Sequence, residues 1–171
     1  MDVYQCIRSR VEVRSFLPDP IPEPVIRKIL RAGRWAPSQR NRQPWHFIVI
    51  RERETLKQLS TLTSSGAYIA QANLAIAIVM ENARMPQFDA GRLIANMALT
   101  AWSEGVGTCF VGGFDHEKVK GLLNVPQSME FITAMPYGYP TEEAKSHGKR
   151  RKPLAETTHR ERFGERWMDI S

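Results

Sequence analysis

The chain has 171 residues, of which 42% are hydrophobic and 25% charged, values typical of one globular domain with its own core. No apolar run approaches the ~20 residues of a membrane helix, and the first residues lack the apolar segment of a signal peptide, so we expect a cytoplasmic protein without membrane contacts. The net charge is +6, but most basic clusters interleave acidic residues, which is more typical of a solvated surface than of a nucleic-acid-binding face.

Apolar residues recur with helical or extended periodicity along the whole chain. In chain order, we expect a helix at 3–10, a helix from the turn at 19–23 to Arg34, a strand at 45–50, a surface helix at 52–62, a strand at 74–80, a helix at 86–104, a strand at 108–111, a helix capped by Asp115 and ending at Leu123, and a strand at 131–135. The continuous apolar run 74–80 is typical of a strand buried on both faces. This alternation predicts a three-layer α/β or α+β fold with a central sheet, in a single domain spanning 1–171.

Residues 35–47, reading W-A-P-S-Q-R-N-R-Q-P-W-H-F, form a connector without glycine between a predicted helix and a predicted strand. A connector that only reverses the chain is usually rich in glycine. This one contains Ser38, Gln39, Asn41 and Gln43, whose side chains both donate and accept hydrogen bonds. The segment therefore predicts a binding site for something flat and polar.

The run Lys149–Lys152 carries positive charge without an acidic neighbour. From the residues alone it is a solvated tail segment, an RNA contact or a site for one small phosphate group. The RNA reading is the weakest, because the aromatic-bearing sheet pattern of RNA-binding domains is missing. The basic C-terminal tail, residues 149–171, also contains Leu154, Phe163 and Trp167. Large apolar side chains on a polar tail usually dock onto another surface, here a partner subunit.

The sequence contains no familiar catalytic motif. Gly105-Val106-Gly107 follows a predicted helix and does not complete the G-x-G-x-x-G pattern of a dinucleotide-binding fold. The two cysteines and four histidines lack metal-ligand spacing, so no metal site is expected. If the protein is an enzyme, we expect a bound cofactor to carry the reaction.

Three sets of polar and basic residues are candidates for holding such a cofactor. They are Arg10 and Arg14 near the start of the chain, Ser38, Asn41 and Gln43 in the connector, and Lys149 and Arg151 near the end. Arginine suits bidentate phosphate binding, lysine adds a point charge, and amides suit the edge of a heterocycle such as a flavin. Each set also has a plainer reading, as a basic helix end, a polar loop or a solvated tail, and the residues alone leave both readings open.

Four motifs occur in a fixed order along the chain. The first is Arg10-Val11-Glu12-Val13-Arg14-Ser15-Phe16, which is compared with the pattern R-R-S-x-R-x-F, and the second is Pro37 to Trp45, which matches P-S-x-x-N-x-Q-P-W. The third consists of Asp89, Gly91, Asn96-Met97-Ala98-Leu99 and Ala101, followed by Gly105 to Cys109 and Gly112-Gly113-Phe114-Asp115. The fourth is Gly138-Tyr139-Pro140 with Arg151-Lys152-Pro153-Leu154. Each motif is degenerate alone, but all four in order are specific. With them, residues 7–154 resemble the FMN-dependent nitroreductase family.

The resemblance implies an α+β fold with a central mixed sheet flanked by helices, in an intertwined homodimer that binds FMN at the subunit interface. Four cations would bind the FMN phosphate, namely Arg10, Arg14, Lys149 and Arg151. Ser38, Asn41 and Gln43 would reach the flavin of the other subunit. The backbone of Gly112 and Gly113 would lie over the isoalloxazine ring.

The resemblance also implies the reaction. NADH or NADPH would reduce FMN and leave, and a small oxidised acceptor such as a nitroaromatic or a quinone would then be reduced, in a ping-pong order. No catalytic side chain is expected, because FMN carries the chemistry. The alternatives are a flavoenzyme of the same fold with another reaction, dehalogenation or flavin breakdown, and a non-catalytic FMN-binding module.

The chain departs from the family pattern in the first motif, where Val11 and Glu12 replace the second arginine and the serine. A carboxylate that points at a phosphate is unfavourable when both groups are desolvated. Two outcomes are open: Glu12 turns to pair with a neighbouring arginine, or phosphate binding is weaker or rearranged.

Overall fold

The computed structural model describes residues 1–82, 84–146 and 148–167. Its helices are α1 (Val3–Ser9), α2 (Glu23–Arg34), η1 (Gln39–Asn41), α3 (Arg53–Thr61), η2 (Ala67–Gln71), α4 (Pro86–Ser103), α5 (His116–Leu122), α6 (Glu142–Lys145) and α7 (Leu154–Thr157), where η marks a 3-10 helix. Its strands are β1 (Trp45–Ile50), β2 (Leu74–Met80), β3 (Gly107–Thr108) and β4 (Glu130–Gly138).

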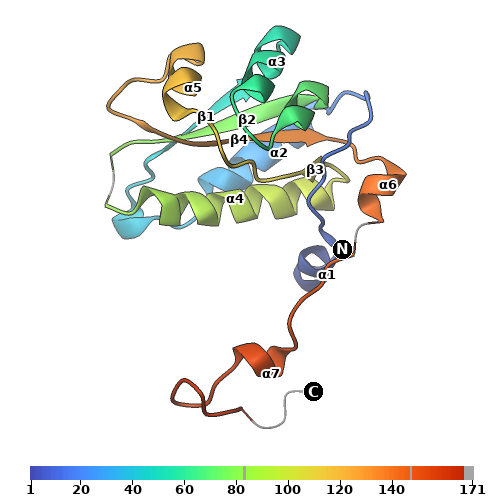
Figure 1. Ribbon diagram of the computed structural model, residues 1–171, viewed down its shortest axis with the longest axis vertical. Helices are drawn as coiled ribbons and strands as arrows, with labels where there is room; N and C mark the ends of the chain where they lie inside the picture. The colour runs from blue at the N-terminus through green and yellow to red at the C-terminus, as the bar shows by residue number, and fades with distance from the viewer. Residues whose placement is uncertain (83, 147, 168–171) are drawn as a thin grey trace.

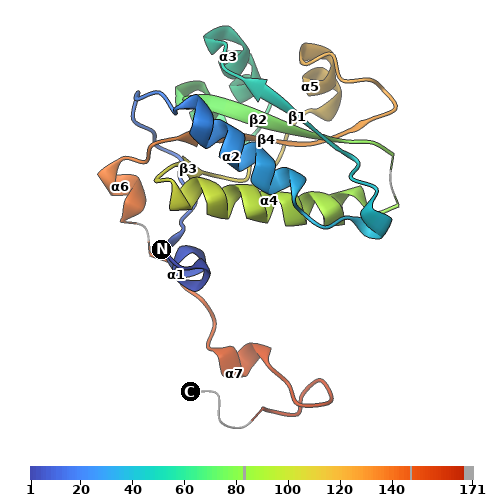
Figure 2. The ribbon, with the colours of Figure 1, turned by 180° about the vertical axis from the view of Figure 1, so that it is seen from behind.

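Helices cover both faces of one sheet, which gives three layers (Figures 1 and 2). The strands lie in the order β1-β2-β4-β3, and each neighbouring pair is antiparallel. α2 and α4 pack against one face, and α3, η2 and α5 against the other. The predicted α+β class is therefore confirmed. In the part of the chain that the structure describes, the parallel component of the expected mixed sheet is limited to one bridge, between Glu12 and Thr108.

Strand β2 is the centre of the molecule, and all its residues are buried. Its alternate side chains enter two separate cores, since successive residues of a strand point to opposite faces. Ile76 and Ile78 face α2 and α4, whereas Ala75 and Ala77 face α3 and α5. The unbroken apolar run in the sequence therefore reflects a strand covered on both sides.

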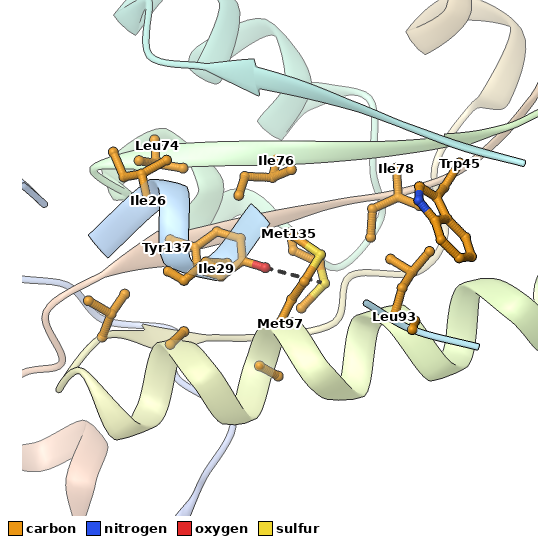
Figure 3. Close-up of a cluster of buried hydrophobic side chains, with 14 of the residues drawn as sticks. Ile26, Ile29, Trp45, Leu74, Ile76, Ile78, Leu93, Met97, Met135 and Tyr137 are labelled. Atoms are coloured by element: carbon orange, nitrogen blue, oxygen red, sulfur yellow. Dashed lines mark hydrogen bonds between the residues drawn. The ribbon is translucent and has the colours of Figure 1, made fainter. Parts of the chain in front are cut away.

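The core beneath the sheet joins α4 to β4 and β2 (Figure 3). Met97 points from α4 toward Met135 of β4, and the Tyr137 hydroxyl lies 4.0 Å from the Met135 sulfur. α2 approaches α4 closely at Gly33, where a Cβ atom would lie 2.8 Å from the Met97 sulfur. Glycine at this position is what allows the two helices to pack so tightly.

The edge of the sheet differs from the prediction. The strand expected at 108–111 ends at Thr108, because side chains rather than a neighbouring strand bind the next backbone groups. Glu12 accepts the N–H of Phe110 at 3.1 Å, and the Thr133 hydroxyl donates to the Val111 carbonyl at 2.8 Å. Conversely, β4 continues past Pro136, because β3 pairs with its last residues, Tyr137 and Gly138. The short helices η1, η2, α6 and α7 were not predicted from the sequence.

Beyond α6 the chain leaves the body of the molecule, passes beside α1 and extends away from it through α7 (Figure 1). The described part of the basic tail contains a turn in which Arg160 N–H donates to the Glu165 carbonyl at 2.8 Å. Leu154 is 57% exposed, Phe163 93% and Trp167 54%. Within the described ranges, no helix has both the length and the apolar character that crossing a membrane requires. Residues 168–171 of the predicted tail lie outside the described residues.

Candidate functional site

The four predicted phosphate-binding cations, Arg10, Arg14, Lys149 and Arg151, line one pocket of about 500 Å³. The other described residues around it are Val11, Glu12, Ser15, Glu143, Ala144, Gly148 and Arg150. The pocket thus brings together the start and the end of the sequence. Its positive charges outnumber its negative ones, which suits a small multivalent anion.

Local structure fixes the N-terminal side of the pocket. α1 begins with a capping box at Asp2 and ends just before Arg10, whose N–H bonds to the Cys6 carbonyl. The following residues run along the edge of β3, where Val13 N–H donates to the Thr108 carbonyl at 3.0 Å. Arg10 therefore projects from a position where the chain changes from helix to an extended edge.

The C-terminal side is joined to the same edge. Thr141 caps α6 with its side chain, and its N–H donates to the Ser15 carbonyl at 3.3 Å. Lys149 follows and donates from Nζ to the Ile7 carbonyl, the last turn of α1, at 2.7 Å. Burial, together with the charges of Arg10 and Arg151, lowers the pKa of Lys149 from its usual value. Crowding of cations is expected where a phosphate is to be bound.

Glu12 is the acidic group at the centre of this cluster. Its Oε1 lies 2.6 Å from Arg10 Nη2, and its Oε2 accepts the N–H of Phe110 at 3.1 Å. Partial burial acts to raise the pKa of Glu12, but the Arg10 contact and the Phe110 N–H outweigh it, so the pKa is lowered. Of the two outcomes that the sequence left open, the pairing of Glu12 with a neighbouring arginine is confirmed.

Arg14 lies against a pair of neutral polar groups that the sequence did not single out. Its guanidinium carbon is 5.9 Å from the centre of the Tyr68 ring. The Tyr68 hydroxyl donates to the Cys109 sulfur at 3.3 Å. Burial raises the pKa of both Tyr68 and Cys109. Both groups are therefore protonated near neutral pH, and the Cys109 thiol is not an activated nucleophile.

The Gly112-Gly113 backbone is exposed, and side-chain hydroxyl groups bind its carbonyl oxygen at Gly112. Thr63 and Ser65 donate their hydroxyls to the Gly112 carbonyl at 2.7 and 3.2 Å. Gly113 has a φ of +67°, and a Cβ atom there would lie 2.3 Å from the Ser64 hydroxyl oxygen, so a side chain would strain the backbone and displace Ser64. A Cβ atom on Gly112 would enter open space, so the outer face of this segment is free for a flat ligand to approach.

The three predicted residues of the connector do not line the cationic pocket. η1 lies at the N-terminal end of α4, whereas α1 and α6 lie toward its C-terminal end (Figure 1). Within the loop, Ser38 Oγ accepts the N–H of Gln43 at 2.9 Å, and Gln43 Nε2 donates to the Asn41 carbonyl at 3.3 Å. In a single subunit the connector and the cationic pocket thus lie toward opposite ends of α4.

Comparison with known proteins identifies the family. The sequence profile described as "Nitroreductase family" matches residues 7–86 and 63–139. A protein of Methanothermobacter thermautotrophicus named "Putative NADH dehydrogenase/NAD(P)H nitroreductase" is 33% identical over 151 residues, which cover 83% of this chain and 79% of that protein.

Solved structures show the same fold. A protein of Bacteroides thetaiotaomicron with that same name has a TM-score of 0.87 at 23% identity, covering 94% of this chain and 98% of the other. The "FMN-dependent Nitroreductase" of Clostridium difficile has a TM-score of 0.85 at 22% identity, covering 92% and 98%. The resemblance inferred from the four motifs is therefore confirmed, and the chain belongs to the nitroreductase family.

Proposed function

We propose that this protein is a homodimeric, FMN-dependent oxidoreductase that uses NADH or NADPH to reduce small acceptors of the quinone or nitroaromatic type. The observation that carries the proposal is the meeting of Arg10, Arg14, Lys149 and Arg151 around one pocket. Cations brought together from the two ends of a chain repel one another, and an anion bound between them offsets this repulsion. The relative in Methanothermobacter thermautotrophicus, named as an NAD(P)H nitroreductase, supports the same class of reaction.

The residues fit FMN in the chemistry of their donors. Three guanidiniums and an ammonium supply charge-assisted hydrogen bonds for a phosphate. The Gly112-Gly113 backbone offers a surface without side chains, as close approach of a ring requires. FMN, when bound, supplies the redox centre that takes two electrons from the nicotinamide and delivers them to the acceptor in a ping-pong order.

The other side chains near the pocket would help to bind and orient the ligand. Arg14, held over the Tyr68 ring, provides a fixed positive charge beside the ligand. Tyr68 and Cys109 keep their protons, because burial raises both pKa values, so neither competes with the cofactor as a reacting group. The proposal therefore assigns no nucleophilic role to either side chain.

The dimer is part of the proposal, because one subunit supplies only half of the site. Asn41, Ser38 and Gln43 do not line the subunit's own cationic pocket, and we place them against the flavin of the partner subunit. Exposed apolar side chains are available for the interface: Val3 is 74% exposed, Tyr4 68% and Phe110 50%. The basic tail, with Leu154, Phe163 and Trp167, would pack on the partner rather than remain extended in water.

The test is the absorbance spectrum of the purified protein, followed under nitrogen. We expect flavin bands, or their appearance on adding FMN, then bleaching with NADH or NADPH and recovery on adding a quinone. A colourless protein that does not take up FMN would refute the proposal. FMN binding without bleaching would instead favour a binding module, and bleaching without turnover of quinones or nitroaromatics would favour another reaction of the same fold.

A further inference from the structure

Glu12 lies between two pockets. The first is the cationic pocket, and the second, of about 350 Å³, runs along α4 and is lined largely by apolar groups, including Ala98 and Met135. Arg10, Lys149 and Arg151 line both. A ligand with an apolar ring and an anionic end would therefore pass Glu12.

The carboxylate of Glu12 is fixed in this position. One oxygen is bound by the Arg10 guanidinium at 2.6 Å and the other by the Phe110 N–H at 3.1 Å. The Phe110 N–H belongs to the backbone, so this donor cannot rotate away from the pocket. A carboxylate held by two donors keeps its negative charge at neutral pH.

Arg10 is consequently already paired before any ligand arrives. A phosphate that enters the pocket must share the guanidinium with Glu12 and must lie close to a like charge. The neutral end of a flavin that lacks the phosphate meets no such opposition. Arg10, the first cation of the family's motif, is therefore partly neutralised by Glu12 in this chain.

We propose that Glu12 is a specificity-determining residue, which competes with the ligand's phosphate for Arg10 and so reduces the preference of this site for phosphate-bearing over phosphate-free flavins. The inference rests on the proposed flavin-binding function. It makes FMN a loosely held, exchangeable ligand of this protein rather than a permanently bound one. If Glu12 instead orients Arg10 for the phosphate, its substitution should weaken FMN binding and reduce the stabilisation by phosphate.

The experiment compares FMN and riboflavin binding by flavin fluorescence in the wild type, in Glu12→Gln and in Glu12→Ser. Glu12→Gln removes the charge and keeps the shape, and Glu12→Ser removes the charge without a long side chain, in case the amide disturbs the fold. Removing one nearby like charge should tighten FMN binding about tenfold and change riboflavin binding less than about twofold.

The matched control is Glu23→Gln, which changes the net charge equally at an exposed ion pair with Arg51. It should leave both affinities as in the wild type. FMN binding that is unchanged or weaker in both Glu12 variants would overturn the inference. So would an equal gain for FMN and riboflavin, because this would show an effect unrelated to the phosphate.

Inorganic phosphate separates this inference from the proposed function. If no variant binds any flavin, the proposed function fails, but the competition for Arg10 is still measurable as protection by phosphate against thermal unfolding. A larger shift of the unfolding midpoint in Glu12→Gln than in the wild type would support the competition. Equal shifts would overturn it.

Discussion

Asp89 of α4 receives the backbone N–H of Gln39 between its two carboxylate oxygens, at 3.3 Å to Oδ1 and 3.2 Å to Oδ2. Asp89 is only 2% exposed. It therefore anchors η1 at the point where the connector becomes strained: Arg40, Asn41 and Gln43 have φ values of 52°, 56° and 53°. Left-handed conformations of residues other than glycine persist where the surrounding structure holds them.

The first prediction concerns this anchor. Asp89→Ala should lower the free energy of unfolding by about 1–3 kcal/mol, since it leaves the Gln39 N–H without its acceptor. Asp89→Asn keeps one acceptor oxygen and should lose less. Urea unfolding followed by tryptophan fluorescence measures both. Glu117→Ala, at a carboxylate whose side chain is 71% exposed, is the control. Equal stability of Asp89→Ala and the wild type would show that the loop does not depend on this contact.

The second prediction tests whether a site is shared between subunits. Arg14→Ala removes a cation from the pocket, and Asn41→Ala removes an amide from the connector, so each variant alone should bind FMN at least about tenfold more weakly. When the two variants are expressed together, random pairing makes half the dimers mixed, and each mixed dimer contains one intact site. About a quarter of all sites should then bind FMN with wild-type affinity.

Titration of the mixture against each variant alone gives the number of restored sites. The pair Arg14→Ala and Lys149→Ala serves as the control. Both of these residues line the same pocket of one subunit, so in a mixed dimer each pocket carries one of the two substitutions and no site is restored. No recovery in the Arg14–Asn41 mixture, or equal recovery in both mixtures, would rule out a site built from two subunits.

The third prediction concerns the basic tail. A chain that ends at Thr158 keeps Lys149 and Arg151 but loses Phe163 and Trp167, which are 93% and 54% exposed. If the tail packs on a partner, this truncation should lower the fraction of dimer and weaken FMN binding with it. Light scattering after size-exclusion chromatography measures the dimer. Arg160→Ala is a control on the same tail, and a dimer of undiminished stability after truncation would contradict the docking.

The fourth prediction is a pH dependence. The pKa of Glu12 in the folded protein lies below its usual value of 4.5. The charged form of Glu12 therefore stabilises the fold above that pH, and this contribution is lost as the pH falls through the lower, folded pKa. The difference in unfolding free energy between the wild type and Glu12→Gln should thus shrink steadily from pH 6 toward about pH 3. A difference that is constant over this range would mean that the ion pair with Arg10 does not form in solution.

The layers of this protein and its family could be predicted from the residues alone. Periodicity is a local property, so the buried run of β2 and the apolar stripe of α4 could be recognised from neighbouring residues alone. The predicted ends of helices and strands were less accurate, because these ends depend on distant partners. β3 ends where Glu12 accepts the Phe110 N–H, and β4 extends beyond its predicted end because β3 pairs with it.

Which candidate residues lie together could be seen only in the folded chain. Arg10 and Lys149 reach one pocket because the chain after α6 returns to α1, a contact between segments that no local pattern records. The same packing leaves Asn41 outside that pocket and turns Glu12 toward Arg10. The physical reason is that a binding site is made by contacts between distant segments, whereas residue type and spacing describe only what each segment offers.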